Sequence, residues 1–194
     1  MTTLDAPLAP VRTVDGREVP NAGTYALDAS HSHVGFSVRH VMVAKTKGRF
    51  ADVDAAITIG EDPIDSSVEV TIQTASVDTR DEGRDGHLRS DDFFAVEAFP
   101  TMTYRSRKVT PTGSRTWLVE GDLTVRDITQ PVPLSVTFEG GALDPWGGAR
   151  IGFEAHAELD REAFGLTWNQ ALETGGVLVG KTVKIDIEAE AVRQ

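Results

Sequence analysis

Residues 25–40 read YALDASHSHVGFSVRH, and the second half of this stretch decides the fold class. Val34, Phe36 and Val38 alternate there with small or polar residues. A period of two residues is typical of a β-strand that buries one face. The first half holds Asp, Ser and His residues, which are also the residue types of catalytic and metal sites. The same stretch therefore raises the question of fold and the question of function together.

The alternation of apolar and polar residues recurs along the rest of the chain. The one-sided segments are residues 25–40, 49–59, 68–73, 102–105, 117–125, 132–138, 151–159 and 183–191. Phe50 is out of phase with the residues that follow it, which predicts a bulge near Ala51 and Asp52. Eight consecutive strands that each have one apolar face predict an all-β protein, either an antiparallel barrel or a two-sheet sandwich.

Two insertions and an N-terminal extension interrupt or precede these strands. Residues 81–99 lack strand alternation, and Asp81 and Glu82 favour a short helix over roughly residues 81–92. Residues 164–180 form an apolar loop, in which we expect one helical turn that brings Trp168 and Leu172 together. Residues 1–23 show no sustained periodicity, and we assign them as an extension before a single domain, residues 24–194.

Composition excludes several classes of function. The chain has 194 residues, which suits one domain, and a net charge of -11, which argues against nucleic-acid binding and weakens the case for a basic membrane-binding patch. It has no cysteine, which excludes disulfides, thiolate catalysis and cysteine-based zinc sites. No apolar run approaches the roughly 18 residues that a membrane span needs. The first residues lack the basic and apolar regions of a secretory signal, so we expect a cytoplasmic protein.

The predicted interior of the barrel is apolar. An eight-stranded barrel is about the size at which the interior either fills with side chains or holds one small ligand. The one-sided pattern leaves few polar groups to orient a polar substrate, so such an interior suits an apolar guest. A core filled by its own side chains is the alternative, and the pattern alone leaves both open.

Five segments together resemble a known family. They are YALDASHSHVGFSVRHVMVAKTKGRF, TRDEGRDGHLRSDDFFAVEAFP, GDLTVRDITQPVPL, LDREAFGL and VGKTVKIDIEAEA. In this order they resemble the YceI-like family of lipocalin-like, polyisoprenoid-binding proteins over residues 24–192. The resemblance implies an extended eight-stranded barrel with a long interior pocket for a polyprenyl chain, a quinone or a related amphiphile. It implies carriage or storage of that lipid, no established chemistry, and a homodimer.

The lipid is expected to contact the inward-facing side chains and the apolar insertions. The predicted contacts are Phe36, Val38, Met42, Phe50, Val70, Ile72, Phe94, Met102, Tyr104, Val136, Phe138, Phe153, Phe164, Leu166, Trp168, Leu172, Ile185 and Ile187. Arg84 and His87 are predicted headgroup contacts, and an exposed helix face with ion pairs is the alternative for them. Phe93, Phe94 and Phe99 either line the pocket or hold the insertion on the barrel.

The competing hypothesis is a metal-dependent or hydrolytic enzyme that uses residues 28–40. His31 and His33 share strand parity and, with His40, offer a three-histidine pattern, but no carboxylate cluster accompanies them. Asp28, His31 and Ser32 are the residue types of a hydrolytic triad, but the chain has no Gly-x-Ser-x-Gly motif. We therefore predict a non-enzyme with no catalytic residues, no metal and no cofactor other than the bound lipid. Asp28, His31 and Ser32 are expected to satisfy turn and backbone groups at one end of the barrel.

Overall fold

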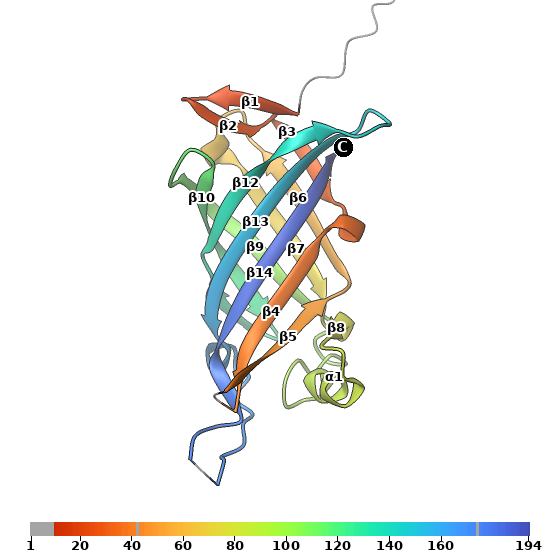
Figure 1. Ribbon diagram of the computed structural model, residues 1–194, viewed down its shortest axis with the longest axis vertical. Coiled ribbons are helices and arrows are strands. Elements are labelled where there is room, and N and C mark those ends of the chain that lie inside the picture. The colour runs from red at the N-terminus through yellow and green to blue at the C-terminus, as the bar shows by residue number, and fades with distance from the viewer. Residues whose placement is uncertain (1–9, 42, 174) are drawn as a thin grey trace, which may run out of the picture.

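The computed structural model describes residues 10–41, 43–173 and 175–194 (Figure 1). The strands are β1 (Val11–Val14), β2 (Arg17–Pro20), β3 (Gly23–Leu27), β4 (His33–His40), β5 (Ala44–Phe50), β6 (Val53–Ile59), β7 (Ser67–Gln73), β8 (Val77–Asp78), β9 (Thr101–Pro111), β10 (Thr116–Val125), β11 (Ile128–Pro131), β12 (Leu134–Leu143), β13 (Ala149–Asp160) and β14 (Val179–Arg193). The helices are α1 (Glu82–Arg89) and the short 3-10 turns η1 (Ala29–His31), η2 (Pro63–Asp65), η3 (Thr74–Ser76) and η4 (Arg161–Phe164).

The large sheet closes into an antiparallel barrel with eight strands around its circumference. The order is β13-β12-β10-β9-β7-β6-β3-β14, and β14 pairs again with β13 along nearly its whole length. β14 pairs with β3 near its C-terminal end and with β4 further back, so β3 and β4 share one position in the barrel. β6 and β5, the partners of β3 and β4, likewise share the next position. The predicted all-β fold with an eight-stranded antiparallel barrel is confirmed.

The stretch that was expected to be one strand, residues 25–40, is two strands joined by η1. The Asp28 carboxylate accepts a hydrogen bond from the Ser30 backbone N–H at 3.0 Å, which caps the 3-10 turn. His31 therefore lies in a turn and His33 starts a new strand. The argument that His31 and His33 share strand parity was wrong for this reason.

The chain breaks between β5 and β6, at the position where a bulge was expected. β5 ends at Phe50 and β6 begins at Val53, with Ala51 and Asp52 between them. The two-residue break changes the phase of the alternation, so that Phe50 and Val53 both face the barrel interior.

The first insertion contains the predicted helix. α1 lies inside the predicted range, and the Asp81 carboxylate caps its N-terminus by accepting a hydrogen bond from the Arg84 backbone N–H at 2.9 Å.

No helix among the described residues has the length and apolarity that crossing a membrane requires.

The second insertion differs from the prediction. Its helical turn is η4, at Arg161–Phe164, before the position expected from the sequence. Residues 166–170 are irregular, and Ala171 forms an isolated bridge with Val177. The predicted turn that would bring Trp168 and Leu172 together was therefore wrong.

The predicted N-terminal extension contains a β-hairpin. β1 and β2 pair in register around a turn at Asp15 and Gly16, which both have positive φ, at 50° and 75°. Figure 1 shows this hairpin across one end of the barrel, and Val19 on β2 is only 1% exposed. Strands of four residues are too short to show a clear period, which is why the sequence showed no sustained periodicity here. Residues 1–9 of the predicted extension lie outside the described residues.

Candidate functional site: a hollow barrel with a basic mouth

The barrel encloses a cavity of about 620 Å³. Val70, Val136 and Ile185 face this cavity and yet are only partly buried, because the space beside them is empty. In a filled core, packed at crystal-like density, such inward side chains would be buried. The side chains of the described residues therefore leave the barrel hollow, and the filled-core alternative does not apply.

The structure places most of the predicted lipid contacts on the cavity wall. They are Phe36, Val38, Phe50, Val70, Ile72, Phe94, Met102, Tyr104, Val136, Phe138, Phe153, Phe164, Leu166, Trp168, Ile185 and Ile187. Leu172 is not part of the wall, because it lies further along the loop, where its backbone N–H bonds to the Gly176 carbonyl oxygen. Met42 lies outside the described residues. Contact of these side chains with a lipid stays a prediction.

One end of the cavity is closed by tight packing. Tyr25, Phe138, Ile151 and Ala191 are each at most 1% exposed and belong to one cluster below the β1–β2 hairpin. The Tyr25 hydroxyl donates to the Asn21 carbonyl oxygen at 2.9 Å, so its polar atom is satisfied. This end can serve as the bottom of a pocket.

The other end is bordered by α1, by the loop after η4 and by the tip of the β4–β5 hairpin (Figure 1). The Trp168 ring contacts the His87 ring at a centroid distance of 4.5 Å and the Phe93 ring at 5.5 Å. These contacts join the loop to the α1 insertion. Phe93 and Phe94 both line the cavity, whereas Phe99 lies under the guanidinium of Arg126 at 5.5 Å. We call this end of the cavity the mouth.

The basic residues that border the cavity are Arg39, His40, Arg84, His87 and Arg161, of which Arg39 has the outward parity on β4. No Asp or Glu belongs to the wall formed by the described residues, although the chain has 30 acidic residues and only 19 Lys and Arg. The charged residues of the wall are therefore basic, although the chain as a whole is acidic. Such a wall favours a neutral or an anionic headgroup over a cationic one.

Arg84 and His87, the predicted headgroup residues, are held in place by neighbours. The Arg84 side chain donates from Nε to Thr79 Oγ1 at 2.7 Å and from Nη2 to the Thr79 carbonyl oxygen at 2.9 Å, which leaves Nη1 for another acceptor. His87 Nε2 lies 2.9 Å from the Asp92 carboxylate. The buried Asp85 carboxylate accepts from the Thr79 backbone N–H at 2.9 Å and fixes Thr79 in turn.

Arg161 positions the loop at the mouth. Arg161 is only 3% exposed, and this burial lowers the pKa of its guanidinium. The guanidinium donates to the carbonyl oxygens of Gly180 and Trp168, each at 2.9 Å, and to that of Leu166. A buried cation whose hydrogen bonds go to backbone carbonyls holds the two ends of the loop together.

Tyr104 brings the main polar group into the middle of the cavity wall. Its hydroxyl lies 3.2 Å from the Val119 carbonyl oxygen and 3.1 Å from that of Val132. Burial raises the pKa of this phenol to about 12, so Tyr104 is neutral at ordinary pH. Because its proton is shared with the backbone, Tyr104 behaves as part of an apolar wall.

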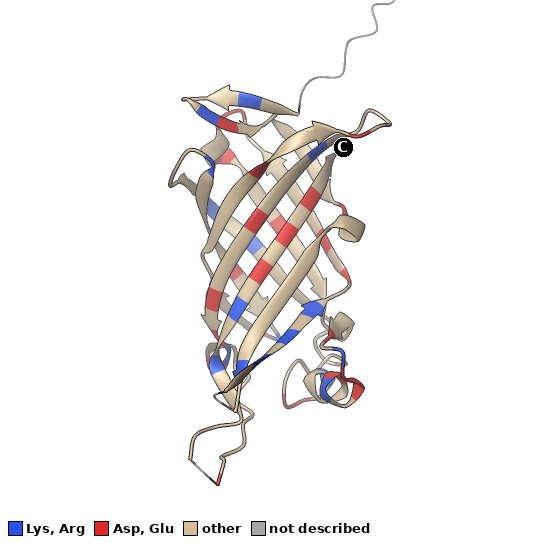
Figure 2. Cartoon of the chain, viewed as in Figure 1, with Lys and Arg blue, Asp and Glu red and all other residues tan. Residues whose placement is uncertain are grey.

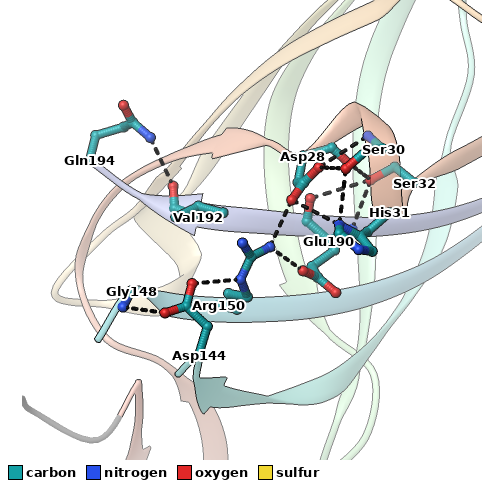
Figure 3. Close-up of polar contacts among 10 residues, drawn as sticks. All are labelled: Asp28, Ser30, His31, Ser32, Asp144, Gly148, Arg150, Glu190, Val192 and Gln194. Carbon is teal, nitrogen blue, oxygen red and sulfur yellow. Dashed lines mark hydrogen bonds and ion pairs between the residues drawn. The ribbon is translucent and has the colours of Figure 1, made fainter. Parts of the chain in front are cut away.

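The polar residues of the opening stretch form a network of hydrogen bonds and ion pairs with Arg150 and Glu190 (Figure 3). The Ser32 hydroxyl donates to the Asp28 carbonyl oxygen at 2.7 Å and accepts from the Glu190 backbone N–H at 3.0 Å. The Asp28 carboxylate accepts from Arg150 Nη1 at 2.7 Å and lies 3.0 Å from His31 Nδ1. Ser32 thus bridges backbone groups of β14 and the turn before β4, as expected, and its hydroxyl is not arranged as a nucleophile toward His31.

The histidines of the opening stretch do not form a three-histidine metal site. His33 and His40 are the first and last residues of β4, about 23 Å apart at the usual rise per residue. Asp28, His31 and Glu190 have ligand atoms within 4.8 Å of one another. Arg150 Nη1, however, bonds to both carboxylates of that group, so a cationic side chain already lies between them.

The YceI-like domain family matches residues 25–191. The chain belongs to the YceI-like family. Among its relatives, UPF0312 protein SA2479 of Staphylococcus aureus is 36% identical over 168 residues, which are 86% of this chain and 95% of that protein.

Solved structures of other proteins share this fold. The Campylobacter jejuni YceI protein aligns with a TM-score of 0.69 and 29% identity over 87% of this chain and 96% of its own. BcnA of Burkholderia cenocepacia aligns with a TM-score of 0.74 and 22% identity over 84% and 98%. A polyisoprenoid binding domain from Saccharophagus degradans aligns with a TM-score of 0.67 and 15% identity over 90% and 100%. The last two likenesses show the fold alone.

Three basic residues of this YceI-like mouth were not predicted from the sequence. They are Arg39, His40 and Arg161. Arg161 lies in the segment LDREAFGL, which was quoted for the resemblance, but nothing in a strand pattern shows that an arginine before a loop turns inward. His40 has the parity of Phe36 and Val38, which was the one available signal that it faces the cavity.

Proposed function

We propose that this YceI-like protein binds a long-chain isoprenoid lipid, either a polyprenyl chain or a quinone-like amphiphile, in its barrel and carries or stores it. The observation that carries the proposal is the cavity of about 620 Å³ with a predominantly apolar wall. Its volume is within the usual range of ligand pockets, roughly 300–1,000 Å³. The Saccharophagus degradans neighbour is named a polyisoprenoid binding domain, and the shared fold supports the same class of guest.

The energetics of burial suit such a guest. Transfer of a CH₂ group from water to an apolar site contributes roughly 0.8 kcal/mol, so each five-carbon unit contributes several kcal/mol before the costs of association and chain ordering. The closed end at Phe138 would receive the end of the chain, and the mouth would hold the headgroup. Arg84, through its Nη1 group, and His87 are the proposed headgroup contacts, with an electron-rich neutral or anionic group as their partner.

The test is mass spectrometry of an organic extract of the purified protein, followed by reloading of the extracted protein with isoprenoid alcohols and quinones of several chain lengths. We expect a long apolar molecule in the extract and a stronger uptake of longer chains. A matched variant is Val136→Phe, which narrows the cavity without a change of charge and should lower the uptake of these lipids. An extract without lipid, together with no uptake of any chain length, would refute the proposal.

An enzyme that uses residues 28–40 is the second hypothesis, and metal analysis of the same preparation separates it from the first. Stoichiometric metal at His31 and no lipid would favour the enzyme. The homodimer stays a prediction, which sedimentation of the purified chain tests.

A further inference from the structure

The β4–β5 hairpin, residues 33–50, is locally basic in an acidic protein. Residues 39–49 contain four Lys and Arg residues and no Asp or Glu, whereas the whole chain has a net charge of -11. Figure 2 shows blue bands on β5, while red bands cross the middle of β13 and β14. The hairpin is therefore a place on this acidic barrel where basic residues gather.

Three cations of this hairpin have no partner in the part of the chain that the structure describes. Arg39, Lys45 and Lys47 are exposed, and no ion pair or hydrogen bond joins their side chains to the described residues. Elsewhere on the barrel the lysines are paired, as Lys108 is with Glu120 and Lys184 with Glu158.

The strand register makes this arrangement costly for the isolated protein. Arg39 lies directly opposite Lys45, and Ser37 lies opposite Lys47. Like charges directly opposite each other on one face of a sheet destabilise the pair. An acidic surface that covered this face would remove the repulsion.

The tip of the hairpin lies at the cavity mouth and is apolar. The Val41 backbone N–H donates to the Leu178 carbonyl oxygen at 2.8 Å, which fixes the tip against the loop that borders the mouth. Val43 follows in the tip and its residue is 83% exposed. Val43 therefore presents an apolar side chain two residues from the unpaired Lys45, and basic residues next to apolar ones favour contact with an anionic bilayer.

We propose that the β4–β5 hairpin docks the cavity mouth on an anionic lipid bilayer. Lys45 and Lys47 would contact lipid phosphates, and Val43 would enter the boundary between headgroups and acyl chains. Exposed acidic residues of the α1 insertion, such as Asp91 and Asp92, border the same mouth and oppose the contact, so Lys45, Lys47 and Val43 have to carry it. The acidic residues of β14 do not oppose it, because charges are screened over about 8–10 Å at physiological salt. β14, with 15 residues, spans about 50 Å, so the acidic residues toward its C-terminal end lie several screening lengths from the mouth. Docking as a route for the guest rests on the proposed function, but docking itself does not.

The cavity mouth and the loop next to the hairpin favour a bilayer over an acidic protein as the partner of the hairpin. The mouth opens into a wall without Asp or Glu that suits a membrane-resident guest. The loop beside the tip, residues 166–178, includes Leu166, Trp168 and Leu178 and has Glu173 as its one charged residue.

The test is flotation of the full chain with vesicles of phosphatidylcholine alone and of phosphatidylcholine with an equal part of phosphatidylglycerol. Each Lys or Arg near an anionic membrane contributes about fivefold in affinity, so Lys45→Gln with Lys47→Gln is expected to weaken binding to the anionic vesicles about 25-fold. The matched control is Arg105→Gln with Lys108→Gln on β9, which changes the net charge by the same amount and is expected to change binding less than about threefold. Val43→Asp is expected to weaken binding as well.

Guest uptake from detergent solution, measured for the same variants, separates this proposal from the proposed function. The lysine variant is expected to take up guest as the wild type does, and to receive it more slowly from anionic vesicles. Wild-type binding that is equal for both vesicle types, or equal losses in the two double variants, would overturn the proposal. Capture of a soluble acidic protein by Lys45 and Lys47 without vesicle binding would also overturn it.

Discussion

Filling the cavity with larger side chains distinguishes a hollow barrel from a packed one. Val70, Val136 and Ile185 lie on three different strands and all face the cavity. We expect Val70→Phe, Val136→Phe and Ile185→Phe, made singly, to fold with nearly the stability of the wild type. The matched control is Val77→Phe, because Val77 is 0% exposed and is not part of the cavity wall.

The magnitude follows from what each added ring meets. At Val77 the ring has no room, and overpacking of a filled core costs typically 1–3 kcal/mol. At the three cavity positions the ring enters empty space and meets no atoms that it must displace. The free energy of unfolding should therefore change by less than about 0.5 kcal/mol. For a domain of this size the control should lose roughly 2–4 °C in Tm per kcal/mol.

Two measurements on lipid-free protein check this expectation. Urea unfolding gives the free energy of unfolding, and titration with an isoprenoid alcohol gives guest affinity. Each cavity variant should lose affinity, because a ring that occupies the space of about two CH₂ groups of the guest removes roughly 1.6 kcal/mol of burial. The reasoning is refuted if the cavity variants lose as much stability as Val77→Phe, or if they keep the stability and bind the guest as tightly as the wild type.

Two further predictions concern titrating groups. Burial raises the pKa of Tyr104 from 10.0 to about 12. The wild type should therefore lose about 2 kcal/mol of unfolding free energy relative to Tyr104→Phe as the pH rises from 10 to 12, and the difference between the two proteins should be nearly constant below pH 9. Urea unfolding at several pH values measures this difference. Hydrogen bonds from Ser30 and Arg150 hold the pKa of the Asp28 carboxyl well below its usual range, a stabilisation that is present above pH 3.8 and is lost as the pH falls toward the folded-state pKa. Arg150→Gln should therefore move the midpoint of acid unfolding to higher pH, and an unchanged midpoint in circular dichroism would contradict the role of Arg150.

The fold could be predicted because its main signal is local. Val183, Ile185 and Ile187 alternate with polar residues, and that period is enough to identify a strand and its inward face. The parts that were wrong or were missed depend on a capping side chain or on strands too short to show a period. η1 forms because the Asp28 carboxylate caps a turn inside what looks like one segment, and β1 and β2 are strands of only four residues.

The candidate site could be predicted only in part, since the inward face is periodic and the volume inside it is not. Val70 would have the same place in the pattern in a filled barrel and in a hollow one. The difference depends on how far apart the opposite walls lie, which is set by the closure of β13 on β14 and by the strand tilt of the whole barrel. No segment of the sequence carries that distance.

Charge shows the same limit from another direction. A net charge of -11 led to the expectation that a basic membrane-binding patch is unfavourable, because the sum over the chain hides where the charges lie. The β4–β5 register places Arg39 opposite Lys45, so the local charge of this hairpin is opposite to the sum over the chain. The acidic residues lie elsewhere, many of them on the outer faces of other strands, and none on the described wall. A protein with this distribution of charge can remain repelled from most anionic surfaces along its length and still present one basic hairpin, at the end where an apolar guest would enter or leave.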